Sequence, residues 1–481
     1  MRKLLALAFC AFLLVCAAPA ANAQTKVEFE GALKVLHHNL VNFNRASDKD
    51  YKQSDSFFEN RFEVGINFKP NEDILVHWRM RAPDYQRWGA NNGIDNGTQG
   101  SSSSSRVFTR SIYATITQDW GKLSIGRLED GFPTSQRGLM TLGYSYGGDY
   151  IYTLPFDNSS VVDGISYTLK LDNGFGLNAY YAKDATQDVN YQYPLRDKDV
   201  DSDRFGIEPF YQWDGGGTAL NLEYVRDMTD INVEKNYSFF INPAVMQTWG
   251  PFSIRFEGKF GWGETQLRGE DFKRKDKGLG LYLEGNYNYG AGDINLLAWY
   301  ADGTDRKDRD DGRKTQHDLV DLGDFAPFLV AFYGNTLGNR VPEGFPTGTR
   351  RKGYGPIVVD RFGNVVTNLY DEGILAQDKN QWGIGILGNH SFTDKIKVNY
   401  GVGYFELVEE YYQGQSKELG YEFDVGINIK LLDNLTFESQ FGYMINGKAY
   451  DNFIDFDDNG KAIFHDAKDT YAWVSALKFN F

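Results

Sequence analysis

Two short motifs carry residue types that other proteins use for catalysis or cofactor binding. Residues 143–147 read Gly-Tyr-Ser-Tyr-Gly, the G-x-S-x-G spacing that places a nucleophilic serine on a sharp strand-to-helix turn. Gly383, Gly385 and Gly388 have the G-x-G-x-x-G spacing of a dinucleotide-binding loop. Both chemistries need a helix directly after the motif, and neither motif precedes a helix-forming run. We therefore interpret the first as part of a loop and the second as small residues within a strand.

A third motif has the spacing of a calcium loop. Asp455, Asp457, Asn459 and Gly460, with Asp466 at the twelfth place, match the positions that supply oxygen ligands around a tight glycine turn. The flanking residues alternate as in strands and do not form helices. Two interpretations stay open, a low-affinity calcium site in an acidic extracellular loop and an ordinary hairpin turn, and no other cofactor is expected.

Thiol chemistry is excluded from the mature chain. Residues 1–23 combine a charged start, a short apolar run and a small-residue cleavage site, the pattern of a removable secretory signal. Both cysteines, Cys10 and Cys16, lie inside this segment. We expect residues 24–481 to form a single domain without disulfides or cysteine-ligated metal.

Charge and composition narrow the class of protein. The formal net charge of the 481 residues is −15, which disfavours binding to nucleic acid. After the signal there is no apolar run long enough for a membrane-spanning helix. The chain is nevertheless rich in Tyr (30), Phe (35) and Gly (52). A transmembrane β-barrel and a large soluble all-β protein both fit this composition, so the periodicity has to decide.

Alternation of apolar and polar residues runs along the whole mature chain. In residues 61–68 the even positions are apolar, and the odd positions include Arg61, Glu63 and Asn67. The same pattern recurs in 74–81, 252–262, 421–429 and 471–481. Because the second face carries charge in nearly every strand, the pattern favours a barrel with a wet interior and lipid outside.

Turn residues predict the number of strands. Eight short turns rich in Gly, Asn and Asp alternate with nine longer polar segments. The turns lie at 70–73, 119–121, 172–174, 214–217, 250–251, 290–293, 393–395 and 432–434. The longer segments lie at approximately 44–56, 82–105, 128–160, 184–202, 229–233, 264–276, 302–377, 409–416 and 447–467. We predict an all-β transmembrane antiparallel barrel of about 18 strands, with 16 as the alternative, short periplasmic turns and long extracellular loops.

The third long segment, 128–160, is the candidate constriction loop. It is far longer than a hairpin requires, and its acids could face arginines on the opposite wall. Such rows of fixed charge would set a transverse field across a narrow channel. In the alternative interpretation the arginines pair along the wall with Glu59 and Glu63. The predicted constriction residues are Arg61, Arg79, Arg81, Arg127, Glu129, Asp130, Asp149 and Asp157.

The loop at 302–377 is unusually long and contains the apolar piece 325–332. We hypothesise that it folds over or into the pore, or clamps a neighbouring subunit.

The chain resembles the Gram-negative outer-membrane porins. The resemblance lies in the signal, the alternating strands, the segment from Arg106 to Arg127 before the long third loop, and the last strand, which ends on Phe481. It departs in the third loop, where Gly131-Phe132-Pro133 stands in place of a Pro-Glu-Phe-Gly-Gly type of signature. A count of eighteen strands points toward the sugar-specific or alginate-export-like barrels. The resemblance implies that Phe481 is an assembly signal read by the barrel assembly machinery, and that the protein is a homotrimer.

We therefore expect a passive diffusion channel in the outer membrane for small hydrophilic solutes and ions, in contact with membrane lipid and lipopolysaccharide. The charged residues that the alternation assigns to the barrel interior include both acids and bases. Most of the excess negative charge must therefore lie in the loops, which predicts a weak preference for cations. The alternatives are a channel specific for saccharides or polysaccharides, an outer-membrane hydrolase that uses Ser145, and a barrel that holds a partner protein.

Overall fold

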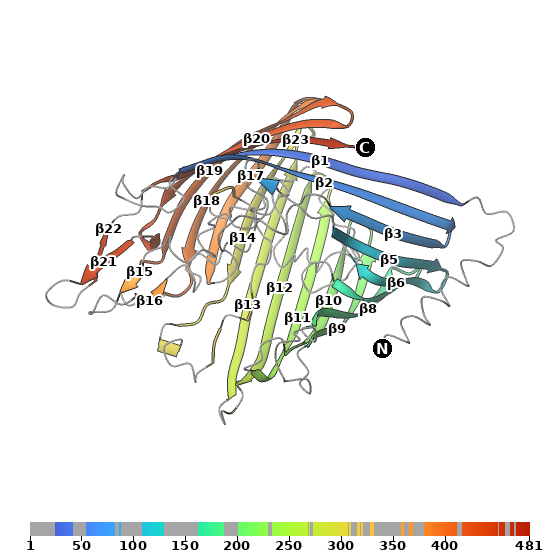
Figure 1. Ribbon diagram of the computed structural model, residues 1–481, viewed down its shortest axis with the longest axis horizontal. Helices are drawn as coiled ribbons and strands as arrows, with labels where there is room; N and C mark the ends of the chain where they lie inside the picture. Colours follow the sequence, from blue (N-terminus) through green and yellow to red (C-terminus); the bar gives the residue numbers. More distant parts are fainter. Residues whose placement is uncertain are drawn as a thin grey trace.

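A closed antiparallel β-barrel accounts for most of the described chain. The computed structural model describes residues 25–41, 54–81, 86–87, 108–128, 162–186, 201–228, 233–267, 269, 273–305, 307–308, 315–317, 319–320, 328–330, 357–359, 365–368, 380–410, 416–450, 452–456, 462–465 and 468–481. The sheet closes because β1 (Lys26–Val41) pairs with β2 (Ser54–Asn71) on one side and with β23 (Thr470–Asn480) on the other. In Figure 1 the two ends of the chain's colour range accordingly meet along this seam.

Eighteen strands make up the wall, as predicted. The sheet has 19 members, but the two-residue β4 pairs with β2 beyond the end of β3, so β3 and β4 form one interrupted wall strand. The remaining wall strands are β3 (Ile74–Arg81), β4 (Gln86–Arg87), β5 (Phe108–Gln118), β6 (Gly121–Leu128), β7 (Val162–Lys170), β8 (Phe175–Thr186), β9 (Asp201–Trp213), β10 (Gly216–Asp227), β11 (Val233–Trp249), β12 (Phe252–Leu267), β13 (Lys273–Asn288), β14 (Gly292–Ala301), β17 (Gln381–Thr393), β18 (Ile396–Leu407), β19 (Glu418–Leu432) and β20 (Leu435–Asn446).

All eight predicted short turns join consecutive wall strands at one end of the barrel. Glycine is required where the turn backbone enters the left-handed region, as at Gly174 with φ 88° and Gly215 with φ 75°. Sequence reasoning did not predict the small elements inside two of the long loops. These are the hairpins β15 (Ile357–Val359) with β16 (Val365–Asn368) and β21 (Asn452–Phe456) with β22 (Ala462–His465), and the short 3₁₀ helix η2 (Lys448–Tyr450).

No helix among the described residues is long and apolar enough to cross a membrane.

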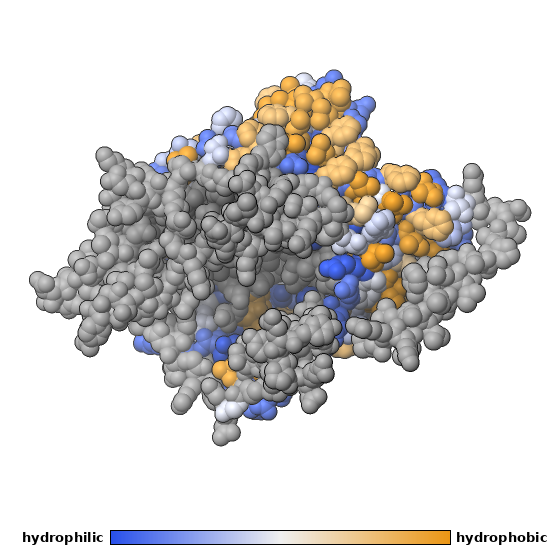
Figure 2. Space-filling model, viewed as in Figure 1, coloured by the Kyte–Doolittle hydropathy of each residue, from blue (hydrophilic) through white to orange (hydrophobic). Residues whose placement is uncertain are grey.

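The outer face of the wall is apolar and exposed. Phe29 is 68% exposed and Leu296 is 60% exposed, and exposed large apolar side chains recur on nearly every wall strand, a contiguous surface that water-soluble monomers rarely carry. Figure 2 shows apolar side chains gathered over the outside of the wall around β20, β23 and β1 to β3. The predicted alternation is confirmed, because partners in the ladder share a face and the outward partners are apolar. The outer surface therefore suits a lipid environment.

The C-terminal residue completes the seam. Gly31 and Phe481 exchange two backbone hydrogen bonds, with N···O distances of 2.8 and 3.0 Å. The Phe481 ring lies 6.1 Å from that of Phe62 and covers Gly31, where a Cβ atom would lie 2.3 Å from the ring and 2.8 Å from the Glu63 carbonyl oxygen. The last residue is thus ordered by the first strand, because only glycine leaves room for its ring.

Replacing Gly31 with valine should therefore impair closure of the barrel. The branched side chain has to displace both the Phe481 ring and the β2 backbone, at a cost of about 1–3 kcal/mol. The fraction of folded protein, measured by the heat-dependent mobility shift on a denaturing gel, should fall. Gly285→Val is the matched control, because nothing lies within 4 Å of a Cβ atom there. Equal folding of the two variants would contradict this account of the seam.

Candidate functional site

The inner face of the wall is polar, and it carries acids and bases in nearly balanced numbers among the described residues. The strand register places every inward charge inferred from the sequence on this face, the same face as the buried polar residues Ser124, Asn221 and Asn399. These charges are Glu28, Lys34, Lys122, Arg204, Glu208, Glu223, Lys259, Glu284, Lys397, Glu422 and Glu438. Fixed charges of both signs suit an aqueous pathway for polar solutes.

The predicted arginines of the second and third strands do face the lumen, and they bind acids along the wall. Arg61 and Arg81 both contact Glu63. The Arg79 guanidinium donates to Glu30 Oε1 at 2.7 Å. Glu30, Gly65 and Arg79 lie in one row across β1, β2 and β3, so the bridge passes over a glycine that has no side chain to block it. These contacts agree with the wall-pairing interpretation, with Glu30 as a partner that sequence reasoning missed. A role of these three arginines in the constriction stays a prediction.

Arg127 was wrongly predicted to line the constriction. It pairs in the ladder with Ile112 and Asp163 and shares a face with Ile125. Ile112 is 51% exposed and Ile125 is 49% exposed on the outside of the barrel. Successive side chains of a strand alternate between faces, so Arg127 points away from the lumen.

The other predicted site residues fall largely outside the described residues. This holds for Glu129, Asp130, Asp149 and Asp157 in the third loop, and for Asp457, Asn459 and Asp466 in the calcium motif. Asp455 lies in β21, which forms a hairpin with β22. Within the described part of the chain, no cluster of three or more His, Cys, Asp and Glu residues could hold a metal ion.

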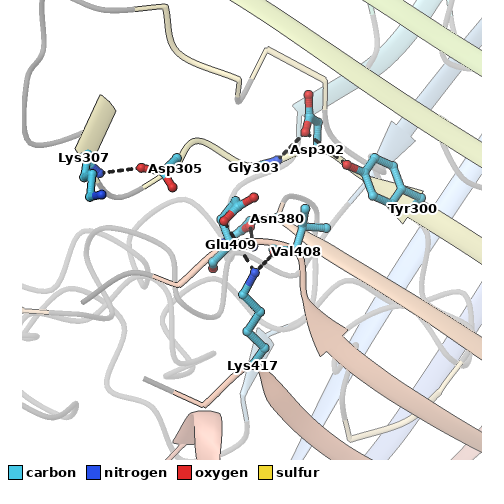
Figure 3. A network of polar contacts seen from close by, with 9 residues as sticks. All are labelled: Tyr300, Asp302, Gly303, Asp305, Lys307, Asn380, Val408, Glu409 and Lys417. Atoms are coloured by element: carbon cyan, nitrogen blue, oxygen red, sulfur yellow. Dashed lines mark hydrogen bonds and ion pairs between the residues drawn. The ribbon is translucent and has the colours of Figure 1, made fainter. Parts of the chain in front are cut away.

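The long loop between β14 and β17 is tied together at its stem by a network of polar contacts (Figure 3). Asn380, whose φ is 53°, donates its side-chain amide to the Glu409 carbonyl oxygen at 3.0 Å and accepts from the Glu409 N–H at 2.8 Å. Its own backbone N–H donates to the Asp302 carbonyl oxygen at 3.0 Å. Lys417 adds a contact to the Val408 carbonyl oxygen. The stem thus connects the end of β14, the start of β17 and the loop that follows β18.

Beyond the stem the loop runs beside β13. The ladder between β13 and β14 begins at Gly280, so the edge of residues 273–279 is open to the loop. Gln316 donates its backbone N–H to the Lys275 carbonyl oxygen at 2.9 Å and accepts from the Lys277 N–H at 2.8 Å. Val320 then covers Gly278, where a Cβ atom would lie 2.4 Å from the Val320 nitrogen. The loop therefore crosses to the inner face of the wall over a glycine.

Residues 328–330 lie inside the barrel, on the inner wall of β17 to β20. We call this contact the loop seat. Phe328 packs on Gly385, Gly401 and Gly403, where added Cβ atoms would lie 2.6 to 3.3 Å from its ring. The Phe328 ring also contacts Phe405 edge-on, with 5.2 Å between centroids, and is completely buried. Gly385 lies four residues after Gln381, the first residue of β17, which is about 13 Å along the strand from its extracellular end. Because Phe328 packs on Gly385, this part of the loop reaches well into the lumen.

Two buried carboxylates complete the loop seat. The Leu329 N–H donates to Asp424 Oδ2 at 3.0 Å, and the Val330 N–H donates to Glu422 Oε1. Hydrogen bonds to a carboxylate are stronger than neutral ones, and they satisfy backbone donors that would otherwise be buried without a partner. The seat therefore combines a shaped apolar contact with two oriented polar bonds, which together fix the loop against the wall.

The sequence held a signal for the loop seat. The piece 325–332 is unusually apolar for a loop, and the spacing of Gly383, Gly385 and Gly388 predicts small residues on the wall. Gly383 and Gly385 do face the lumen, and Gly385 receives Phe328. What the spacing could not reveal was that Gly401 and Gly403 of the neighbouring strand lie beside them, so that a cavity for one aromatic ring forms.

The protein is an outer-membrane diffusion channel by class. Its closed β-barrel has an apolar outer face, a charged inner face and a loop inserted into the lumen. The family model for Gram-negative porins matches residues 6–409, and the chain belongs to that family. Both the predicted family and the predicted location in the outer membrane are confirmed.

Solved structures of other proteins align with this chain at low sequence identity. Pseudomonas aeruginosa OccK9 (OpdG) aligns with a TM-score of 0.50 and 9% identity, over 95% of this chain and 98% of its own, and shares this fold. OccK8 (OprE) of the same organism gives 0.49 and 10%, over 95% and 98%. The trimer form of OmpT from Vibrio cholerae gives 0.41 and 12%, over 96% and 100%. None of the curated proteins matches the chain significantly.

Exchanging Arg79 for glutamine should make the channel more cation-selective. The change leaves Glu30 without this partner on the lumen face. A unit charge contributes about 1 kcal/mol at 4 Å in water, so the cation-to-anion permeability ratio should rise by at most about fivefold. Reversal potentials in a salt gradient give this ratio. Arg127→Gln removes the same charge from the outer face and should leave the ratio unchanged; a shift in that variant as large as in Arg79→Gln would contradict the assigned faces.

Filling the loop seat should widen the channel. In Gly403→Leu the new side chain occupies the space of the Phe328 ring, and in Phe328→Ala the ring is removed, with a loss of about 3–5 kcal/mol of packing. Both changes should release the loop and raise single-channel conductance. Gly285→Leu, on the outer face, is the control for Gly403→Leu. A conductance that stays the same or falls in both seat variants would show that the seated loop does not narrow the pathway.

Proposed function

We propose that the channel passes small hydrophilic solutes and ions by passive diffusion, without a solute-specific binding step. The observation that carries this proposal is the loop seat, which brings a segment of the long loop inside a barrel whose wall is lined by charges of both signs. A lumen of this kind stays wet, because fixed charges replace part of the hydration of a polar solute and disfavour apolar ones.

The loop between β14 and β17 sets the aperture in this proposal. Side chains alone do not fill a barrel of eighteen strands, so a narrower passage needs an inserted segment. The stem network, the contact with β13 and the loop seat hold this segment at three separated places. Three attachments favour a fixed constriction over a freely moving lid. The sequence-based proposal that loop 128–160 also constricts the channel stands beside this one.

A weak cation preference follows from where the charges lie. The net charge of the chain is −15, whereas the inward charges of the described wall nearly balance. The excess of acids therefore belongs to the connections between strands, which raise the local concentration of cations near the channel entrance. Salt screens such a field over about 8 Å at physiological ionic strength, so the preference should be modest.

A homotrimer is supported by charged residues on the outer face of the wall. Arg127 and Asp163 pair in the ladder between β6 and β7 and share the face of the exposed Ile125. Charges that face lipid on a barrel wall are destabilising, by about 2–4 kcal/mol for a basic residue at the bilayer midplane. Protein subunits, rather than lipid chains, would cover these charges most favourably.

No chemical step is part of this proposal. The Gram-negative porin family and this fold are those of channels rather than enzymes. Removal of residues 1–23 during export and recognition of Phe481 by the assembly machinery remain predictions from the sequence.

Recordings in planar bilayers test the proposal. The purified protein should insert as ohmic channels that close in three equal steps, as expected for three pores in one particle. Current should rise in proportion to salt concentration, with a small cation preference that declines at high salt. Mono- and oligosaccharides should reduce the current only in proportion to solution viscosity. Saturable block by one sugar would contradict passive diffusion and favour the saccharide-specific alternative, and single-step closure would contradict the trimer.

A further inference from the structure

An aromatic row crosses the outside of the barrel near its extracellular end. Ladder pairing joins Tyr181 to Phe205, Phe205 to Tyr224, Tyr224 to Phe239 and Phe239 to Trp262 across β8 to β12. Neighbouring ring centroids along this row are 4.9, 6.4, 4.9 and 5.8 Å apart. Aromatic side chains of this kind mark the boundary between the hydrocarbon and the head groups of a membrane.

A groove lies below the aromatic row, on the side of the periplasmic turns. It has a volume of about 720 Å³, and its lining is almost entirely apolar. The floor includes the small residue Ala179 and the aliphatic residues Ile207, Leu222 and Ile241, which form the next outward row of the ladder. A volume of this size is in the range of about 300–1,000 Å³ that holds small ligands. Because the groove opens to the membrane, its natural occupant is a hydrocarbon chain.

A cluster of lysines stands at the end of the aromatic row. Lys273, Lys275 and Lys277 alternate along the outward face of β13, and Lys277 pairs directly with Trp262. Lys273 contacts Glu264 at 3.2 Å, and Lys235 contacts the same carboxylate at 3.6 Å. Lys275 and Lys277 form no ion pair with any residue that the structure describes. The cluster thus has an excess of positive charge.

Above the other end of the aromatic row, the charges of the described residues are compensated. Lys183 contacts Asp201 and Asp203, and Arg226 contacts Asp203 at 3.1 Å. Tyr181, a member of the row, donates its hydroxyl to Asp203 at 2.8 Å. These contacts fix the upper edge of the groove without attracting an anion. An anionic group would therefore be drawn to the β13 end, beside Trp262.

From this geometry we propose that the outer wall of β8 to β13 binds lipopolysaccharide. Acyl chains occupy the apolar groove, and a phosphate group of the same molecule binds Lys273, Lys275 and Lys277. The groove lies directly beneath an aromatic row that is near the extracellular end of the barrel, so its lipid comes from the outer leaflet, where lipopolysaccharide is the anionic lipid with several acyl chains. A single positive charge near a membrane surface contributes modestly to anion binding, but three on one strand face act together.

Native mass spectrometry of the purified protein in detergent tests this inference, with rough lipopolysaccharide and phosphatidylglycerol as probes at equal concentration. The triple variant Lys273→Gln, Lys275→Gln and Lys277→Gln removes the phosphate contacts, and Ala179→Trp fills the groove. Each should lower the occupancy by lipopolysaccharide at least about tenfold. The heat-dependent mobility shift verifies that each variant is folded.

Matched controls lie elsewhere on the barrel. Val425→Trp places the same indole side chain on the outward face of β19, and Lys395→Gln with Lys430→Gln removes lysines at the periplasmic end. Both controls should bind lipopolysaccharide as the original chain does. Equal retention of phosphatidylglycerol would overturn the assignment to lipopolysaccharide. If lipopolysaccharide occupancy is unchanged in Ala179→Trp or in the triple lysine variant, the proposed site is wrong. It is also wrong if a second copy of the chain covers the groove in oligomers that contain no lipid.

Discussion

The need to satisfy every backbone hydrogen bond inside a lipid layer is the constraint on which the structure depends. An open sheet edge in hydrocarbon leaves a row of amide and carbonyl groups without partners, so the sheet has to close. The seam between β1 and β23 does this, and Phe481 extends it by two backbone bonds to Gly31. The outer side chains then become apolar because they contact lipid, whereas the inner side chains are free to be charged. The channel thus follows from the closure of the sheet.

Glycines on the inner face convert this wide tube into a shaped pathway. Where the wall lacks side chains, other groups come close to the backbone: Phe328 over Gly385 and Gly403, and Val320 over Gly278. The ion pair between Arg79 and Glu30 likewise passes over Gly65. In each case a glycine allows contact between groups that the strand order keeps apart. The positions of inward glycines therefore determine where the loop can attach and which charges meet.

Much of the fold was predictable from the sequence, because alternation and turn chemistry are local properties. The strand number, all eight short turns and the inward charges follow from residues a few positions apart. The mistake at Arg127 was avoidable on the same grounds, since Leu123 and Ile125 already assign its alternate position to the outside. The ion pair between Arg79 and Glu30, in contrast, was not predictable from local sequence. Glu30 meets Arg79 only through the register of three strands, which the sequence of any one strand does not specify.

The loop seat lay further from prediction, because it joins segments that are nearly a hundred positions apart. The piece 325–332 was identifiable as apolar, but its destination depends on the cavity formed jointly by β17 and β18 and on the acceptors Glu422 and Asp424 of β19. These two carboxylates also illustrate why charge alone is a poor guide to function. An inward acid in a channel suggests contact with passing cations. Here both acids instead accept backbone N–H groups, so their role is to position the loop, and the loop in turn decides how much of the lumen a solute can use.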